Sequence, residues 1–461
     1  MTAPLPLDMS ADPTPYRYSA PARLDSILFY GVFGLLLFGP LAFGAVEPWS
    51  ILILQAGTGL LFVVWAVQQG RVREVEIAGS PLFLPMLFFA FVILLQLVSG
   101  RTVYRAATFS SALLYCTYGG MSFLVVQVLR KTSQVRMLAW TLSIYGFAIA
   151  MFALLQGLSS NGKLYWVMTA QSGGWIYGPY VNHNHYAGLM EMLTPVPLVI
   201  SFNPGVRREY RVLAGVAAAV MASTIFLSGS RGGMIAFAAE MALLAGWLIK
   251  REKTWRPVLV FGAFLLIAAG LAAWVGGSEL LDRVATIHGP VQGEISSGTR
   301  LQIARDAARM FAQRPVLGWG LGVFQDVYPQ FRSFPTDMQV DRAHNDYIQV
   351  LAETGGLGFA AVLWLLFSVY RSGFRKLRAG VPDFNTHLTV AALLGITGIL
   401  VHSFADFNLQ IPANAMLFYG FCAVAAMEPR FGLQRRLRHR RHRAADGLQD
   451  DLPAAATASI G

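Results

Sequence analysis

Histidine, asparagine and two carboxylates lie close together in RAHNDYIQVLAETG, residues 342–355, just before a long apolar run. In a helix with 100° per residue, His344 falls on the apolar face, while Asp346, Gln349 and Glu353 fall on the opposite face. We therefore expect the polar face to point to water and His344 to point inward at the helix start, where an N-terminus disfavours the imidazolium form. A neutral imidazole is a candidate general base, and a packed histidine near a membrane surface is the alternative.

Arginines upstream of this stretch suit an anionic ligand. In GTRLQIARDAARMFA, residues 298–312, Arg300 lies on the apolar helix face, and Arg305 and Asp306 lie on the polar face. Arg231 lies in the small-residue stretch SGSRGG between two apolar runs, where a ligand can approach the backbone. A guanidinium held on a packed face suits phosphate, whereas an arginine that snorkels to the membrane surface is the alternative in both cases.

Further polar residues are candidates for substrate contact. IYGPYVNHNHYAG, residues 176–188, has two histidines spaced by two, but metal sites need three or four ligands, so we favour hydrogen bonds to a sugar. HSFADFNLQIPANA, residues 402–415, is a hairpin where helix capping and turn chemistry are an equally good explanation. We also expect Asn345 and Asp346 to cap the helix that follows them. The candidates for substrate contact are Asn182, His183, Asn184, Asn345, Tyr347, Glu353, His402, Asp406, Arg101 and Arg105.

Composition shows what surrounds these residues. Of the 461 residues, 55% are hydrophobic and 13% are charged, with a mean hydropathy of +0.50, whereas soluble proteins carry about 25% charged residues. The apolar runs are continuous, which predicts helices that span a membrane. The net charge of +11 does not indicate a nucleic-acid partner, because the basic residues lie in short loops and in the tail, where they act as a topology signal. The two cysteines, Cys116 and Cys422, are too few for a disulfide framework or a cysteine metal site.

The chain is therefore predicted to be an all-α polytopic membrane protein with about twelve spans. We place the spans near 27–46, 50–67, 81–98, 111–129, 136–157, 186–202, 212–229, 234–249, 257–275, 356–370, 388–405 and 413–427. Basic residues then gather in alternate loops and in the tail, so both termini are predicted to be cytoplasmic. The large loop 276–355 would lie on the outer side. Residues 1–25 and the end of the basic tail, 430–461, are expected to be disordered around a bundle at 26–429.

Three stretches resemble the O-antigen ligase and Wzy-type O-antigen polymerase superfamily of bacterial membrane glycosyltransferases. They are SGSRGG, SGTRLQIARDAARMFAQRPVLGWGLGVF and HNDYIQVLAETGGLG, which occur in the family's order and spacing within residues 176–415. The most specific part is RPVLGWGLGVF followed by HNDY and then by Glu353 and Gly355. The first five predicted spans match the family only in being apolar.

The resemblance implies a GT-C-like bundle in the bacterial inner membrane with an active site open to the periplasm. It implies that a glycan moves from undecaprenyl diphosphate to a sugar hydroxyl, on lipid A core in a ligase or on another lipid-linked glycan in an O-antigen or exopolysaccharide polymerase. Inversion at the anomeric carbon and the absence of any metal or cofactor are also implied. Matched by motif, Arg231 and Arg300 would hold the diphosphate, with Arg305 as a further candidate, and His344 would deprotonate or orient the acceptor hydroxyl.

Two other classes of protein are compatible with the sequence. A transporter or flippase of lipid-linked glycans would need charged residues along the middle of several spans. The predicted spans hold few, with Glu191 and Glu240 as the main exceptions, so we favour an enzyme. The third class is a noncatalytic polysaccharide-assembly protein. The sequence does not separate a ligase from a polymerase, because both use the same donor and similar motifs.

Overall fold

The computed structural model describes residues 22–427 except 72–76, 170–175, 253–258, 260, 272, 275–296, 337–338 and 380–383. Most of the expected disordered segment 1–25, the tail 430–461 and the first part of the loop 276–355 therefore lie outside the described residues. All the named elements of the described chain are helices. The prediction of an all-α protein is confirmed for this part of the chain.

Eight helices of the described chain are long and apolar enough to cross a membrane. They are α1 (Ala22–Leu41), α2 (Pro48–Gly70), α4 (Arg105–Val128), α5 (Thr132–Leu158), α8 (Arg208–Leu227), α9 (Arg231–Glu252), α13 (Asp346–Arg378) and α14 (Phe384–His402). Three further predicted spans correspond to shorter apolar helices, namely α3 (Phe83–Val98), Phe261–Leu271 and α15 (Pro412–Ala426). The expected count of about twelve spans is thus not confirmed.

The predicted span 186–202 is two short helices. α6 (His183–Leu193) has Thr194 as its C-cap, and α7 (Pro195–Ser201) begins directly after this residue. Proline has no backbone N–H to continue the ladder of hydrogen bonds, so Pro195 starts the second helix instead of extending the first. Every residue of α6 is buried, including its polar ones, which places this short helix inside the bundle.

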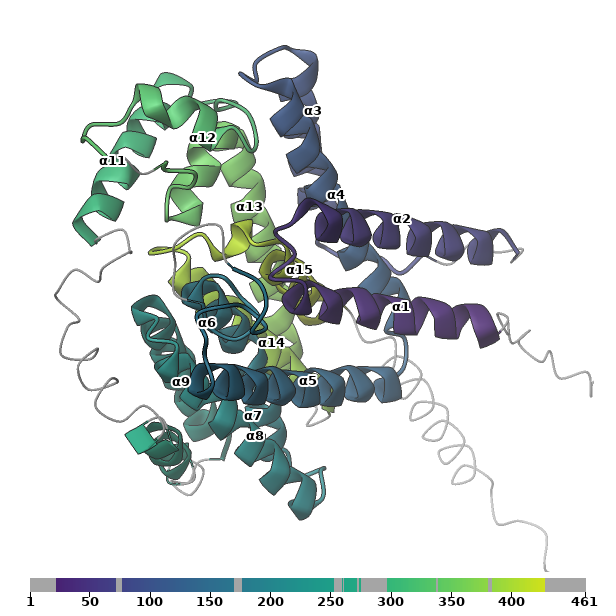
Figure 1. Ribbon diagram of the computed structural model, residues 1–461. Helices are drawn as coiled ribbons and strands as arrows, with labels where there is room; N and C mark the ends of the chain where they lie inside the picture. The colour runs from purple at the N-terminus through teal and green to yellow at the C-terminus, as the bar shows by residue number, and fades with distance from the viewer. Residues whose placement is uncertain are drawn as a thin grey trace, which may run out of the picture.

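α14 is the central helix of the bundle. It packs against α9 and α15 and against α6 and α7, and in Figure 1 it lies in the middle of these helices. Most of its residues are buried, as expected for a helix that is apolar all round. The end of α14 at His402 is therefore held from several sides, and the chain turns there into η3 (Asn408–Gln410) and α15.

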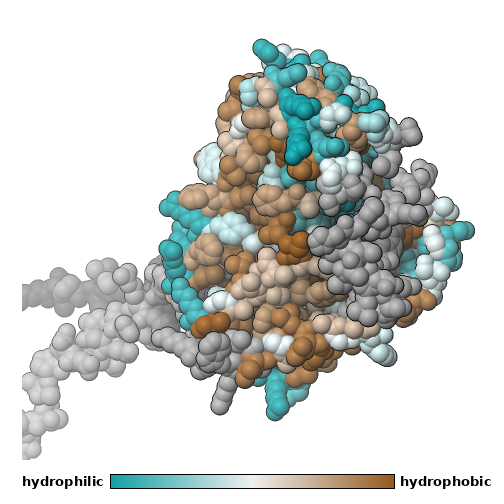
Figure 2. Space-filling view, turned by 90° about the vertical axis from the view of Figure 1, so that its left-hand side faces the viewer, coloured by the Kyte–Doolittle hydropathy of each residue, from teal (hydrophilic) through white to brown (hydrophobic). Residues whose placement is uncertain are grey.

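The segment that precedes α13 forms a small unit with its own apolar core, which we call the outer unit because it lies at the edge of the structure in Figure 1. It contains α11 (Ser297–Gln313), α12 (Phe324–Val327) and η2 (Tyr328–Gln330). Its core is separate from the large core of the bundle. In Figure 1 the unit lies at the upper left, beside the start of α13, and in Figure 2 hydrophilic side chains gather at the same height.

The polar face of α13 is buried, so the prediction that it points to water is wrong. Asp346, Gln349 and Glu353 are 4%, 0% and 2% exposed. Glu353 accepts the backbone N–H of Gly322 at 2.9 Å and that of Phe324 at 3.2 Å. A buried loop needs acceptors for its backbone N–H groups, and the Glu353 carboxylate supplies them. The helical projection showed only that polar residues share one face of the helix.

Asp306 of α11 is buried for a similar reason, although the projection placed it on the outward face. Its Oδ2 accepts hydrogen bonds from the hydroxyl of Tyr328 at 3.3 Å and from the backbone N–H of Ser333 at 3.0 Å. Its Oδ1 accepts one from the guanidinium of Arg309 at 3.0 Å. The expected apolar face is also buried, since Ile303 and Ala307 are fully covered. Buried carboxylates therefore fasten the outer unit at both Asp306 and Glu353.

Candidate functional site

Asp406 lies at the centre of a cluster of polar side chains from separate segments of the chain. Its Oδ1 is 3.8 Å from Nδ1 of His344, which precedes α13, and 3.9 Å from Nε2 of His185 in the first turn of α6. Its Oδ2 is 4.0 Å from Nη1 of Arg300 in α11. The Asp406 carboxylate is only 1% exposed. We call these four residues the Asp406 cluster.

The electrostatics of the cluster favour a charged carboxylate between its basic neighbours. Burial by itself would raise the pKa of Asp406, but His344, His185 and Arg300 outweigh burial and hold the pKa of this carboxyl well below its ordinary value. Burial lowers the pKa of His185 to about 4, although Asp406 partly opposes this. At neutral pH, Asp406 is therefore a carboxylate and His185 is a neutral imidazole.

Several buried polar atoms of the cluster lack a hydrogen-bond partner in the described chain. These atoms are Oδ2 of Asp406, Nδ1 of His344, Nε2 of His185 and Nε of Arg300. Buried polar atoms are nearly always hydrogen-bonded in folded proteins, and unsatisfied ones point to strain or to a functional site. Their convergence on one place makes the Asp406 cluster the strongest candidate for a binding and catalytic centre in this part of the chain.

The backbone around His344 is arranged to present its ring. His344 has φ +49°, a left-handed conformation that residues with a side chain seldom adopt. The next residue, Asn345, caps α13 by accepting the backbone N–H of Ile348 at 3.1 Å, so the predicted cap at Asn345 is confirmed. The ring of Phe407 packs edge-on against both His344 and His185, with centroids 4.8 Å apart in each case.

Asp346 binds the loop that carries Asp406. Its side chain does not cap the start of α13 as predicted. Its Oδ2 accepts hydrogen bonds from the hydroxyl of Ser403 at 2.8 Å and from the backbone N–H of Leu409 at 3.1 Å. The backbone N–H of Asp346 also donates to the carbonyl of Ser403 at 3.0 Å. The start of α13 and the loop after α14 are thereby held together, which brings His344 to Asp406.

Arg300 reaches the same loop from the outer unit. Its Nη1 donates to the carbonyl of Ala405 at 2.7 Å, and its side chain is 23% exposed. Arg305, five residues further along α11, is exposed. Five helical residues correspond to 500°, or 140° around the axis, so Arg305 faces away from Arg300. The structure thus brings Arg300, but not Arg305, to the Asp406 cluster.

Arg231 is the first residue of α9, directly after the tight turn at residues 228–230, and the last two glycines of SGSRGG belong to the helix. Oγ of Ser230 in this turn is 3.5 Å from Nε2 of His402. His402 is the last residue of α14, and its carbonyl accepts the backbone N–H of Asp406 at 3.2 Å. The turn that precedes Arg231 is therefore connected to the Asp406 loop through His402.

The residues of 182–185 make different contacts. Asn182 caps α6 by accepting the backbone N–H of Asn184 at 2.8 Å, and the Asn184 side chain is buried. Nδ1 of His183 lies 2.8 Å from the carbonyl of Ser228. Only His185 reaches Asp406, although sequence reasoning did not select it as a site residue. The spacing could have indicated this, because His183 and His185 are two residues apart in the first turn of α6 and therefore point to different sides of the helix.

Other predicted site residues serve the fold. Glu353 holds the backbone of the outer unit, and the hydroxyl of Tyr347 donates to the carbonyl of Leu400 at 2.6 Å. Arg101 and Arg105 have exposed side chains beside the outer unit. There the Arg101 carbonyl accepts the guanidinium of Arg314 at 2.9 Å. In the described part of the chain, neither Arg101 nor Arg105 contacts Asp406.

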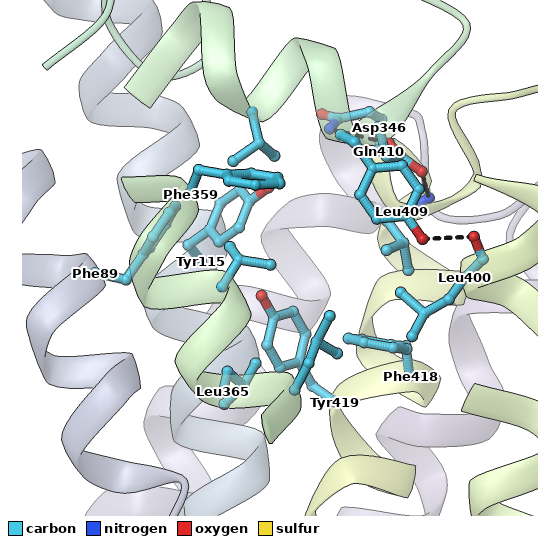
Figure 3. Close-up of a pocket in the computed structure, with 14 residues that line it drawn as sticks. Phe89, Tyr115, Asp346, Phe359, Leu365, Leu400, Leu409, Gln410, Phe418 and Tyr419 are labelled. Atoms are coloured by element: carbon cyan, nitrogen blue, oxygen red, sulfur yellow. Dashed lines mark hydrogen bonds between the residues drawn. The ribbon is translucent and has the colours of Figure 1, made fainter. Parts of the chain in front are cut away.

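An apolar pocket lies behind the loop that carries Asp406, between α3, α4, α13, α14 and α15 (Figure 3). Its walls include Phe89, Phe359 and Leu365, with the rings of Tyr115 and Tyr419 among them. Asp346 and Gln410 form its polar end. Since Asp346 also holds the Ser403–Leu409 loop, this pocket adjoins the Asp406 cluster from the side of the membrane helices.

Comparison with known proteins points to one family. Residues 216–363 match the model of the O-antigen ligase family. The match includes Arg231, Arg300 and His344 and ends before Asp406. No curated protein matches the chain. The predicted resemblance of this chain to the O-antigen ligase and Wzy superfamily is confirmed by this match over residues 216–363.

Proposed function

We propose that this protein is a membrane glycosyltransferase that moves a glycan from undecaprenyl diphosphate to the hydroxyl of an acceptor sugar. The acceptor is lipid A core in a ligase, or a second lipid-linked glycan in a polymerase of O-antigen or exopolysaccharide. The convergence of His344, His185 and Arg300 on Asp406, within reach of the turn that bears Arg231, carries the proposal. The family match supports it.

His344 is the proposed general base. Asp406 lies beside Nδ1 of His344, so it favours the tautomer with the proton on Nδ1 and leaves Nε2 to accept a proton. As Nε2 takes the proton of the acceptor hydroxyl, the hydroxyl oxygen bonds to the anomeric carbon. The bond from that carbon to the diphosphate oxygen breaks, and its electron pair leaves with the diphosphate. One displacement of this kind inverts the anomeric carbon, and Asp406 stabilises the imidazolium that forms.

Arg231 and Arg300 are the proposed ligands of the diphosphate. The leaving group gathers negative charge as the glycosidic bond breaks, and fixed guanidinium groups stabilise that charge without reorganising. Arg300 is already held at the carbonyl of Ala405 by Nη1, while its buried Nε has no hydrogen-bond partner among the described residues. The planar guanidinium can therefore bind phosphate with the donors that remain. Two arginines in place of a metal give a mechanism without a cofactor.

The setting of the site fits a donor with a lipid anchor. The described chain has eight candidate spans, and the apolar pocket of Figure 3 lies beside the cluster between helices that include α4, α13 and α14. A lipid-linked substrate keeps its diphosphate at the membrane surface, and we propose that Arg231 and Arg300 lie at that level. We propose that the protein resides in the bacterial inner membrane, with both termini in the cytoplasm and the Asp406 cluster on the periplasmic side.

Transfer by purified protein in liposomes tests the proposal. With undecaprenyl diphosphate-linked glycan and an acceptor, the wild type should form product, and Arg231→Ala, Arg300→Ala and His344→Ala should each abolish it at unchanged membrane insertion. EDTA should leave the rate unchanged. Full transfer by any of the three variants would remove that residue from the mechanism, and no transfer by the wild type with either kind of acceptor would overturn the proposed function.

The surface glycans of a deletion strain separate the two kinds of acceptor. Single repeat units on lipid A core would indicate a lost polymerase, whereas full-length lipid-linked polymer that never reaches the core would indicate a lost ligase. Loss of a secreted polymer with intact lipopolysaccharide would indicate an exopolysaccharide polymerase.

A further inference from the structure

A second buried pair of acidic and basic side chains lies next to the Asp406 cluster. Nδ1 of His402, at the end of α14, is 2.9 Å from Oε1 of Glu191 in α6. The two side chains are 1% and 0% exposed. The mechanism proposed above uses neither of them. Replacing such a pair by apolar residues is often neutral or stabilising, so packing alone does not explain a carboxylate and an imidazole here.

The pair touches the turn that precedes Arg231. Nε2 of His402 is 3.5 Å from Oγ of Ser230, and the same Oγ accepts the backbone N–H of Gly233 at 3.1 Å. A Cβ on Gly232 would lie 2.5 Å from Cδ2 of His402, closer than real contacts allow. The first turn of α9 thus rests directly on the imidazole, and the glycine after Arg231 permits this approach.

Glu191 makes a similar contact with the next residue of α9, Gly233. A Cβ on Gly233 would lie 2.9 Å from Oε1 of Glu191 and 2.8 Å from Cβ of Ala187. The two glycines that follow Arg231 therefore face the two members of the pair, one each. This accounts for both glycines by packing against the pair, whereas the sequence suggested only room for a ligand.

His402 also holds the turn that bears Asp406, through its backbone carbonyl. Its carbonyl accepts the backbone N–H groups of Ala405 at 2.9 Å and of Asp406 at 3.2 Å. The carbonyl of Ala405 in turn accepts the guanidinium of Arg300 at 2.7 Å. The carbonyl of His402 therefore holds the turn that bears Asp406 and the Ala405 carbonyl to which Arg300 donates. Its ring contacts the turn that precedes Arg231.

We propose that Glu191 and His402 are positioning residues that hold the α9 turn bearing Arg231 in register with Arg300 and Asp406, so that both arginines meet one diphosphate. This inference rests on the proposed function. Without the pair, α9 and the loop after α14 would keep their helices but lose the fixed distance between the arginines. Displacements of about 1 Å from the productive geometry are known to cost about 10²-fold in rate.

Two substitutions of His402 separate its two contacts. Asparagine places its amide near the position of Nδ1, so His402→Asn keeps the link to Glu191 and loses the link to Ser230. Glutamine reaches the position of Nε2, so His402→Gln keeps the link to Ser230 and loses the link to Glu191. We expect each to lower kcat at least tenfold, and Glu191→Gln to do the same. Ser230→Ala removes only one hydroxyl and tests the link if the other variants fail to fold.

A double-mutant cycle with Arg231 provides the decisive measurement. If His402 acts by placing Arg231, then His402→Asn should cost at least tenfold in the wild type and less than threefold in an Arg231→Ala background. Because Arg231→Ala is expected to abolish transfer, the single variants are compared in transfer, and the cycle itself is read in the Kd of detergent-purified protein for inorganic pyrophosphate. Tyr370→Phe, which removes a 2.7 Å hydrogen bond from α13 to Thr397 of α14 away from the pair, is the matched control and should change both readouts less than twofold.

The outcomes distinguish the two proposals. Equal losses from His402→Asn with and without Arg231, at unchanged folding, would overturn the positioning role and leave the proposed function intact. A wild type that neither transfers glycan nor binds pyrophosphate would overturn the proposed function and the positioning role with it. Non-additive losses with the Tyr370→Phe control unaffected would support both.

Discussion

Oδ1 of Asp406 lies 3.8 Å from Nδ1 of His344, although one residue precedes α13 and the other follows α14. Asp406→Asn keeps the shape of the side chain and removes its charge. We expect transfer to fall by about 10²-fold, because the imidazolium formed in the reaction loses its counter-charge and the tautomer is no longer fixed. Initial rates in liposomes measure the loss. Asp326→Asn, at an exposed position of α12, serves as the control, and an equal rate for both variants would contradict the pairing.

Arg300 should not be replaceable by lysine. Its guanidinium donates to the carbonyl of Ala405 through Nη1 and keeps Nε for a ligand, while an ammonium group is a single point that cannot do both. We expect Arg300→Lys to raise KM for the donor about tenfold or more, measured by donor titration. Gln302→Ala on the exposed side of α11 is the control. An unchanged KM in Arg300→Lys would show that the proposed contact with the diphosphate is absent.

Glu353 should matter for stability before it matters for chemistry. Its two carboxylate oxygens accept the N–H groups of Gly322 and Phe324, and Glu353→Ala leaves both donors buried without an acceptor. Hydrogen bonds to charged groups contribute about 1.5–3 kcal/mol each, so we expect a loss of about 3 kcal/mol in the free energy of unfolding. Denaturation in detergent checks this value, with Gln313→Ala at an exposed position as the reference. A loss below about 1 kcal/mol would mean that the outer unit is held by other contacts.

Gly355 allows the outer unit to dock. It has φ +66° inside α13, and a Cβ there would overlap the carbonyl of Val316. Gly355→Ala should therefore destabilise the protein by more than the roughly 1 kcal/mol that a strained backbone alone costs, since the loop must also move. Gly356→Ala, where the nearest atom to a Cβ is 3.3 Å away, is the matched control in the same thermal melt. Equal melting temperatures for the two variants would be inconsistent with the observed packing.

Stability should fall as the pH drops below neutral because of His185. Burial lowers its pKa from 6.5 to about 4 in the folded chain, so the unfolded state binds the proton more tightly. Between pH 6.5 and pH 4, stability is then lost by up to about 1.4 kcal/mol for each pH unit. The carboxyl of Asp406, whose pKa is lowered, adds a loss only when the pH falls below about 4.

Melting curves at several pH values test this sign. His185→Gln has no imidazole to protonate and should show a flatter dependence between pH 6.5 and pH 4 than the wild type. The quantity compared is the slope of stability against pH, because this slope reports the protonation of His185. The absolute stability of the variant is not compared. Parallel curves for the two proteins would assign the acid sensitivity to another group.

The sequence by itself determined the membrane class, the helical secondary structure and the resemblance to the O-antigen ligase superfamily. Continuous apolar runs can satisfy their backbone only as helices in lipid, so composition and length were enough for this part. The sequence also singled out Arg231, Arg300, His344 and Asp406, because charged or polar residues beside apolar runs are unusual. It did not fix the number of spans, since a proline pair divides 186–202 and other apolar helices are short.

Only the tertiary structure decided which of the candidates meet. His185 was one of several polar residues in its stretch, and the position of Asp406 selected it. Helical projection placed Asp346 and Glu353 toward water, because it measures direction around one helix and contains no information about a loop that returns to cover that face. The links from Glu191 through His402 to Ser230 join α6, α14 and α9, and such contacts depend on packing between helices far apart in the chain.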